Sequence, residues 1–128
     1  MNSHTVYLPF PSNNLSPNAR QHWGKHHAAK TAYKLACAWK ATADGLRKID
    51  ADSLRLTYTY FPPAAYRYDK DNLDASMKAA TDAIRDVVGI DDHLFSFGES
   101  KIEAPIRPHG MVKCEISWAI VTREARAA

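Results

Sequence analysis

Arg67-Tyr68-Asp69-Lys70-Asp71-Asn72-Leu73-Asp74 stands where a strand pattern gives way to a helix pattern. Before it, residues 53–61 alternate apolar and polar side chains, which predicts a strand that ends at Pro62-Pro63. After it, residues 72–88 carry apolar side chains every three or four positions, which predicts a helix with one buried face. Gly89 is typical of the residue that ends such a helix. The buried face is expected to consist of Leu73, Met77, Ala80, Ile84 and Val87 or Val88.

The rest of the chain supplies further strands and one more helix. These elements are a short edge strand at 5–10, a helix at 28–46 that stops near Gly45, and two strands at 94–103 and 111–121 that form a hairpin. The strands at 53–61 and 94–103 are expected to be parallel, because the helix between them makes a right-handed crossover. The predicted fold is a single α+β domain over residues 1–128, a mixed β-sheet with two helices in the order β-α-β-α-β-β.

The composition fits one globular domain with an uneven distribution of charge. The chain has 128 residues, of which 45% are hydrophobic and 24% charged, and this is enough apolar surface for one ordinary core. The formal net charge of +3 is only mildly basic. Basic residues concentrate between Arg20 and Lys48, and acidic residues between positions 69 and 103. Such a separation is common where a phosphate backbone is held over metal-binding carboxylates.

No segment of the sequence points to a membrane or to an oxidising compartment. Cys37 and Cys114 lie in apolar patterns without metal-ligand spacing, so we expect two buried, reduced thiols. No apolar run approaches membrane-spanning length, and the N-terminus lacks a cationic-then-apolar signal sequence. A soluble, cytoplasmic protein with no membrane partner is therefore expected.

Four carboxylates flank the predicted helix at 72–88, with Asp69 and Asp71 before it and Asp91 and Asp92 after it. Clustered carboxylates repel one another unless a cation lies between them, and oxygen ligands select a hard ion such as Mg²⁺ or Mn²⁺. Ions of this kind serve phosphodiester hydrolysis. The simpler alternative is that Asp69 or Asp71 caps the free N–H groups of the helix. A helix of about 25 Å separates the two pairs, so the sequence leaves open whether they meet.

Basic residues near these acids have two interpretations. Lys78 lies on the exposed ridge of the helix, where it can neutralise a phosphate or pair with Asp74 or Asp82. The segment between residues 20 and 34 can hold phosphates, with Trp23 stacked on a base or sugar. It can equally be a solvated first helical turn beside a tryptophan of the core. Spacing alone does not separate these interpretations.

The motifs resemble those of the RusA-type Holliday-junction resolvases, small endodeoxyribonucleases of bacteria and their phages. That family has a Leu-Pro-x-Pro-x-Ser-x-Asn segment, then Asp-x-Asp-Asn-Leu leading into a helix with a lysine, then an Asp-Asp pair. The match runs through nearly the whole chain, and the two acidic motifs together are more specific than either alone. The corresponding residues are Leu8-Pro9-Phe10-Pro11-Ser12-Asn13-Asn14, Asp69-Lys70-Asp71-Asn72-Leu73, Lys78-Ala79-Ala80-Thr81-Asp82-Ala83-Ile84 and Asp91-Asp92.

The resemblance implies a homodimer that resolves a four-way DNA junction by paired nicks, with Mg²⁺ or Mn²⁺ as cofactor. It implies metal ligation by Asp69, Asp71 and Asp92, with Asp91 close by, and a catalytic role for Lys78 beside these acids. The lysine of the family corresponds to Ala75 here, so Lys78 is displaced by three residues, about 4.5 Å along a helix. The residues expected to contact DNA are Asn14, Arg20, Lys25, Lys30, Arg67 and Lys70.

Two alternatives share this sequence pattern. One is a non-catalytic protein that binds branched DNA, in which the acids are helix caps and solvated charges. The other is a nuclease with the same site chemistry that cuts flaps or simple duplexes.

Overall fold

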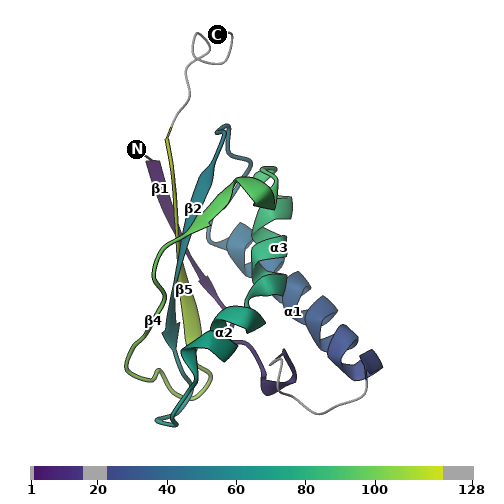
Figure 1. The fold of residues 1–128 in the computed structure, drawn as a ribbon, viewed down its shortest axis with the longest axis vertical. Coiled ribbons are helices and arrows are strands. Elements are labelled where there is room, and N and C mark those ends of the chain that lie inside the picture. Colours follow the sequence, from purple (N-terminus) through teal and green to yellow (C-terminus); the bar gives the residue numbers. More distant parts are fainter. Residues whose placement is uncertain (1, 16–22, 120–128) are drawn as a thin grey trace, which may run out of the picture.

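One mixed β-sheet forms the base of the protein. The structure, a computed structural model, describes residues 2–15 and 23–119, with the side chains of Asn14 and Trp23 left aside. The strands in these residues are β1 (Asn2–Leu8), β2 (Leu54–Phe61), β3 (Phe95–Phe97), β4 (Lys101–Ile102) and β5 (Met111–Trp118). Their order in the sheet is β1-β5-β2-β3, and β4 also pairs with β2 (Figure 1). β5 is antiparallel to both of its neighbours, whereas β3 and β4 are parallel to β2.

The strand β2 confirms the predicted strand at 53–61. Alternate residues of a strand point to opposite faces of the sheet, so its alternating pattern buries one row of side chains. Leu54, Leu56, Tyr58 and Tyr60 are buried in this row, whereas Arg55 on the other face is exposed. Only one face of this strand is therefore fully covered.

Helices cover that face of the sheet (Figure 1). In the described part of the chain they are α1 (Trp23–Ala43), α2 (Lys70–Ser76) and α3 (Lys78–Val88), with short 3₁₀ helices η1 (Asn13–Leu15) and η2 (Asp92–Leu94). The predicted apolar face of residues 72–88 is confirmed, because its members are at most 7% exposed: Leu73, Met77, Ala80, Ile84 and Val88. Gly89 caps α3 in the left-handed conformation, with a φ of 77°, as its sequence position predicts.

The core between helices and sheet contains both cysteines. Cys37 on α1 and Cys114 on β5 are buried and form no disulfide, as the sequence predicts. Burial raises the pKa of the Cys37 thiol to about 12, so this thiol stays protonated at neutral pH. None of the described helices has the length and apolar character needed to cross a membrane.

The prediction of two helices is wrong, because residues 72–88 form two helices rather than one. Met77 has a ψ of 2°, and its N–H bonds the Asp74 carbonyl at 3.1 Å, so the last turn of α2 is tightened. The chain changes direction there, and α2 leaves the axis of α3 (Figure 1). Met77 itself is 1% exposed and accepts a hydrogen bond from the Tyr33 hydroxyl on its sulfur, so packing in the core holds the break.

The predicted hairpin between 94–103 and 111–121 is also wrong. Residues 94–103 form the short strands β3 and β4, and β5 pairs with β1 and β2 instead. The alternate residues Val112, Cys114 and Ile116 are fully buried, so one face of β5 packs against the core. The parallel pairing of β2 with β3, by contrast, is confirmed.

The remaining differences concern element boundaries. β1 ends at Leu8, because Pro9 lacks the N–H that would continue the ladder, and it is an edge strand as predicted. α1 begins at Trp23, earlier than the predicted start at Ala28, and ends before a turn at Asp44-Gly45.

Candidate active site

A cleft of about 650 Å³ lies between the two helices α2 and α3 and the segment that joins β3 to β4. Its inner wall includes Tyr58, Met77 and Thr81, which are buried, and the Tyr58 and Thr81 hydroxyls hydrogen-bond each other at 2.7 Å. The other lining residues are Lys70, Asp71, Asp74, Ala75, Lys78, Asp92, Phe97, Gly98, Glu99 and Ser100. The cleft thus combines an apolar base with a charged rim.

Acidic side chains enter this cleft from two separate segments. Asp71 lies in the first turn of α2, and Asp92 opens η2 after the chain has returned along α3. One acid of each predicted pair therefore lines the same cavity. Among the described residues, none forms an ion pair or side-chain hydrogen bond with the Asp71 carboxylate.

Asp74 is a third acid of the cleft, and its carboxylate bonds Tyr60 and Ser100 rather than Lys78, the partner that its spacing offers. The Tyr60 hydroxyl donates to Asp74 Oδ1 at 2.6 Å, and the Ser100 hydroxyl donates to Asp74 Oδ2 at 3.0 Å. Burial and then this bond to Asp74 raise the pKa of Tyr60. Asp74 follows Asp71 by three positions, which places both on one face of a helix. The partners Tyr60 and Ser100 come from β2 and from the loop before β4, so no local pattern identifies them.

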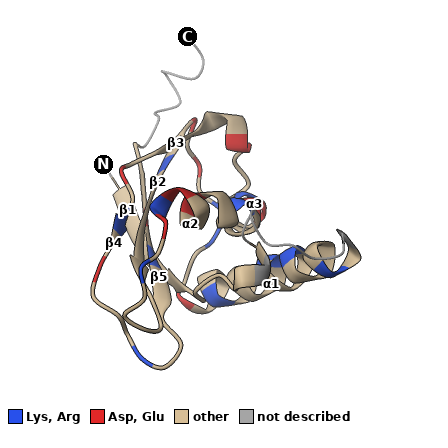
Figure 2. Ribbon diagram, turned by 60° about the horizontal axis from the view of Figure 1, so that its bottom comes forward, with Lys and Arg blue, Asp and Glu red and all other residues tan. Residues whose placement is uncertain are grey.

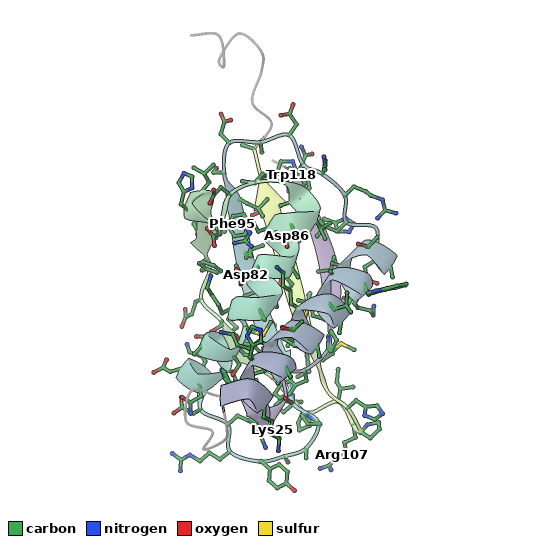
Figure 3. All side chains as sticks on the ribbon, turned by 90° about the vertical axis from the view of Figure 1, so that its right-hand side faces the viewer. Lys25, Asp82, Asp86, Phe95, Arg107 and Trp118 are labelled. Atoms are coloured by element: carbon green, nitrogen blue, oxygen red, sulfur yellow. The ribbon has the colours of Figure 1, made fainter. Side chains whose placement is uncertain are left out.

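Cations hold Asp92 at the other end of the cleft. Arg85 Nη1 lies 3.4 Å and Lys78 Nζ 3.7 Å from Asp92 Oδ2. Lys78 Nζ also lies 3.1 Å from Asp82 Oδ1, so the predicted pairing of Lys78 with Asp82 is present. Lys78 lines the cleft as well. Figure 3 shows Asp82 and Asp86 following one another along α3. Arg85, which the sequence analysis did not single out, contacts both of them as well as Asp92.

The other two predicted acids do not line the cleft. Asp69 caps α2, since its Oδ1 accepts hydrogen bonds from the N–H groups of Asp71 at 2.9 Å and Asn72 at 3.3 Å. Asp91 caps η2 and accepts from the His93 N–H at 3.2 Å. The imidazole of His93, 3.0 Å away, and this backbone bond lower the pKa of Asp91 to about 2. The helix-cap alternative is thus confirmed for Asp69, whose side chain faces a second cavity on the other side of α2.

The donor set suits a hard divalent cation in kind. Asp71, Asp74 and Asp92 offer carboxylate oxygens to one cleft, which is the chemistry that Mg²⁺ and Mn²⁺ select. Within the described residues, however, no group of three His, Cys, Asp or Glu side chains is already gathered as a ligand set. Holding an ion would therefore require these side chains to move toward one another.

The predicted DNA-contacting residues lie in several places. Lys70 lines the cleft, where its Nζ donates to the Ser100 carbonyl at 3.4 Å, and Arg67 is exposed at the second cavity. Lys25 and Lys30 are exposed on α1, along which basic residues recur (Figure 2). Lys25 lies toward the same end of the molecule as Arg107 (Figure 3). Three of the predicted residues are not placed, because Arg20 and the side chains of Asn14 and Trp23 lie outside the described part of the chain.

Comparison with known proteins gives one clear relative. No protein-family model matches the chain. A protein of Xylella fastidiosa described as uncharacterized is 38% identical over 124 residues, which cover 94% of this chain and 79% of that protein. The likeness therefore extends over both acidic segments of the cleft.

Proposed function

The chain belongs to one protein family with this Xylella fastidiosa protein, and we propose that it is a metal-dependent endodeoxyribonuclease that resolves four-way DNA junctions. The observation that carries the proposal is the cleft that Asp71 and Asp92 both line from two separate segments, with Lys78 beside Asp92. The resemblance of the motifs to RusA-type resolvases is the reason for proposing a four-way junction as the substrate. It is also the reason for proposing a homodimer, whose two sites would nick opposed strands.

Asp71, Asp74 and Asp92 are the residues that would hold the cation. Bound Mg²⁺ or Mn²⁺ would supply Lewis acidity for a phosphoryl oxygen and lower the pKa of a bound water. Asp71 has no described side-chain partner to give up, whereas Asp92 would exchange part of its contact with Lys78 and Arg85. Asp74 keeps its orientation through the Tyr60 and Ser100 hydroxyls.

Lys78 is the residue that would meet the phosphate. Its ammonium is anchored by Asp82 at 3.1 Å and is 62% exposed, so it presents a fixed positive charge at the rim of the cleft. An ammonium in that place stabilises negative charge that develops on the phosphodiester oxygens. Lys70 adds a second cation on the α2 side of the cleft.

The rest of the DNA would follow the basic residues outside the cleft. Figure 2 shows lysines along α1 and acidic residues at α2 and at the turn before β3. Exposed lysines such as Lys25 and Lys30 neutralise phosphates without reading sequence. Recognition of the branched shape then depends on how two protomers place their basic helices.

One observation favours a second candidate, a non-catalytic protein that binds branched DNA. Asp92 is already neutralised by Arg85 and Lys78, and no ligand set is gathered among the described residues. Under this alternative the acids would shape the fold and the basic residues would bind DNA.

The substitution Asp71→Asn separates the two candidates. It removes one metal ligand and one negative charge, so cleavage of a four-way junction in Mg²⁺ is expected to disappear while junction binding stays equal or tightens. Glu115→Gln is the matched control, because it removes one exposed charge on β5, and it should cleave normally. Calorimetric titration with Mn²⁺ gives a second readout, since Asp71→Asn should weaken binding of the ion. Persistent cleavage by Asp71→Asn would refute the metal-site proposal.

Two further comparisons refine the test. Asp92→Asn should match Asp71→Asn, whereas Asp91→Asn should keep cleavage, because the Asp91 side chain caps η2 and lies outside the cleft. Four-way, three-way and linear DNA tested side by side distinguish a junction resolvase from a flap or duplex nuclease. Equal cutting of all three substrates would contradict selectivity for junctions.

A further inference from the structure

The second cavity, on the other side of α2, is large and rich in aromatic side chains. Its volume of about 730 Å³ lies in the range of small-ligand sites, roughly 300–1,000 Å³. Three separate segments form it, namely residues 10–13, the turn at 63–69 and the loop at 108–109, together with one face of α2. No part of the proposed cleavage chemistry uses this cavity.

Three rings of the cavity form one chain of edge-to-face contacts. The ring centroids of Phe10 and Tyr68 are 5.5 Å apart at 75°, and those of Tyr68 and Tyr66 are 6.4 Å apart at 63°. Phe10 and Tyr68 are half-buried against the core, so they hold the group in place. Tyr66 is 75% exposed, and therefore leaves most of its ring open to a partner. A single exposed tyrosine would be ordinary, but this one extends an anchored aromatic group over a cavity.

Charged and polar groups surround the rings in a pattern that suits a nucleotide. Arg67, between the two tyrosines in sequence, is exposed and positive, as a phosphate requires. Asp69, whose Oδ1 caps α2, repels phosphate from the interior but can accept from an N–H group of a base, including the ring N–H of thymine. Ser12, Asn13 and His109 add further polar groups at the wall. The interior therefore favours an uncharged, planar, hydrogen-bonding group over an anion.

Helix α2 joins this cavity to the acidic cleft. Its capping residue Asp69 and its residues 72, 73 and 76 line the aromatic cavity, whereas its residues 70, 71, 74 and 75 line the cleft, together with Lys78 at the start of α3. Each set follows the spacing of one helical face, so the two cavities lie on opposite sides of a single helix. A helix with side chains is about 10–12 Å across, a span that neighbouring nucleotides of one strand can cover.

We propose that the aromatic cavity receives an unstacked base of the DNA strand whose phosphodiester lies in the cleft. The position of this base beside the cleaved phosphodiester rests on the proposed nuclease function, whereas the affinity of the cavity for a base does not depend on it. An exposed base stacks on Tyr66, the adjoining phosphate contacts Arg67, and the strand continues over the start of α2 into the cleft. Bases near a branch point are the ones most easily unstacked, so the cavity also favours branched over linear DNA.

The first test measures stacking without cleavage. A fluorescein-labelled oligothymidylate is titrated in EDTA with the whole protein, with Tyr66→Leu and with Tyr66→Phe. Leu removes the ring and Phe keeps it, so only Tyr66→Leu should bind more weakly, by about 5- to 150-fold for one stacked base. In a plot of log binding constant against log salt concentration, Tyr66→Leu should keep the slope of the wild type, whereas Arg67→Gln should reduce its magnitude by about 0.7. The proposal is overturned if the wild type does not bind oligothymidylate, or if Tyr66→Leu binds it as tightly as the wild type.

The second test places the base on the junction. Single abasic nucleotides are introduced one at a time around the branch point, and junction binding is measured in EDTA. An abasic nucleotide at one position beside the cleavage site should weaken junction binding by the wild type. The same abasic junction should bind Tyr66→Leu as tightly as the intact junction does. The two failures are distinguishable. If cleavage requires Asp71 but Tyr66→Leu binds DNA as tightly as the wild type, only the proposal for the aromatic cavity is overturned. If Tyr66→Leu weakens oligothymidylate binding but the protein cleaves no DNA, only the proposed nuclease function is overturned.

Discussion

The hydrogen bond between Tyr60 and Asp74 connects the sheet to the cleft, and Tyr60→Phe tests it directly. Tyr60 is fully buried on β2, and its hydroxyl donates to Asp74 Oδ1 at 2.6 Å. Phenylalanine keeps the ring and its packing, so the substitution removes this one donor. Asp74 then retains only the Ser100 hydroxyl at 3.0 Å among its described partners.

The expected loss follows from the type of bond. A hydrogen bond to a charged group contributes about 1.5–3 kcal/mol, more than one between neutral groups. Asp74 is exposed, so water replaces the lost donor and the net loss falls to about 1–2 kcal/mol. For a domain of this size that lowers the melting temperature by roughly 4–8 °C.

A double-mutant cycle isolates this contribution. Urea unfolding of the wild type, Tyr60→Phe, Asp74→Ala and the double variant, in EDTA and at one salt concentration, should give a coupling energy of about 1–2 kcal/mol. Asp74→Ala also removes the Ser100 contact, which the cycle subtracts. A coupling below about 0.3 kcal/mol, within the range for independent sites, would refute the idea that the bond ties the helix to the sheet.

The same bond predicts a dependence on alkaline pH. Burial and Asp74 raise the pKa of Tyr60 above its ordinary value of 10.0, whereas an unfolded tyrosine ionises near that value. Its contribution to stability is therefore complete below about pH 10 and is lost as pH rises further. Tyr60→Phe should accordingly lose less stability than the wild type between pH 9 and about pH 11.

Two further predictions concern a tight turn and the assembly. A Cβ at Gly110 would lie 2.6 Å from the Phe61 carbonyl oxygen, so Gly110→Ala should lower the free energy of unfolding by roughly 2–5 kcal/mol. Gly89→Ala has a similar φ but open space around it, so it should lose only about 1 kcal/mol, and equal losses in urea unfolding would contradict this reasoning. For the dimer, light scattering should give a mass near twice 14.3 kDa, and a monomer at micromolar concentration would exclude paired nicking by a preformed dimer.

The elements that the sequence predicts well are those fixed by local patterns. Alternation in residues 54–61 sets which face of β2 is buried, whatever its neighbours are. The apolar residues of α3 and the left-handed Gly89 are likewise determined within a few turns of chain. For the same reason the sequence offers Asp69 or Asp71 as a helix cap, although it cannot choose between them or between capping and metal binding, and the structure gives the cap to Asp69.

The features that it misses depend on partners distant in the chain. β5 has the alternation of a strand, but only the completed sheet decides that it lies between β1 and β2. Asp74 looks like a solvated acid until Tyr60 and Ser100 are placed beside it. Only the family resemblance distinguishes Asp91 from Asp92 in the sequence. In the structure Asp91 caps η2, whereas Asp92 lies beside Arg85.

The break at Met77 bears on the unusual position of the lysine. Ala75, where the resemblance places it, and Lys78 are three residues apart, and both line the cleft. A lysine at 75 would stand one turn from Asp71, whereas Lys78 stands beside Asp92 at 3.7 Å. The displacement therefore transfers positive charge from the first acidic segment to the second. Asp71 is left as the carboxylate that a cation reaches without displacing a described partner.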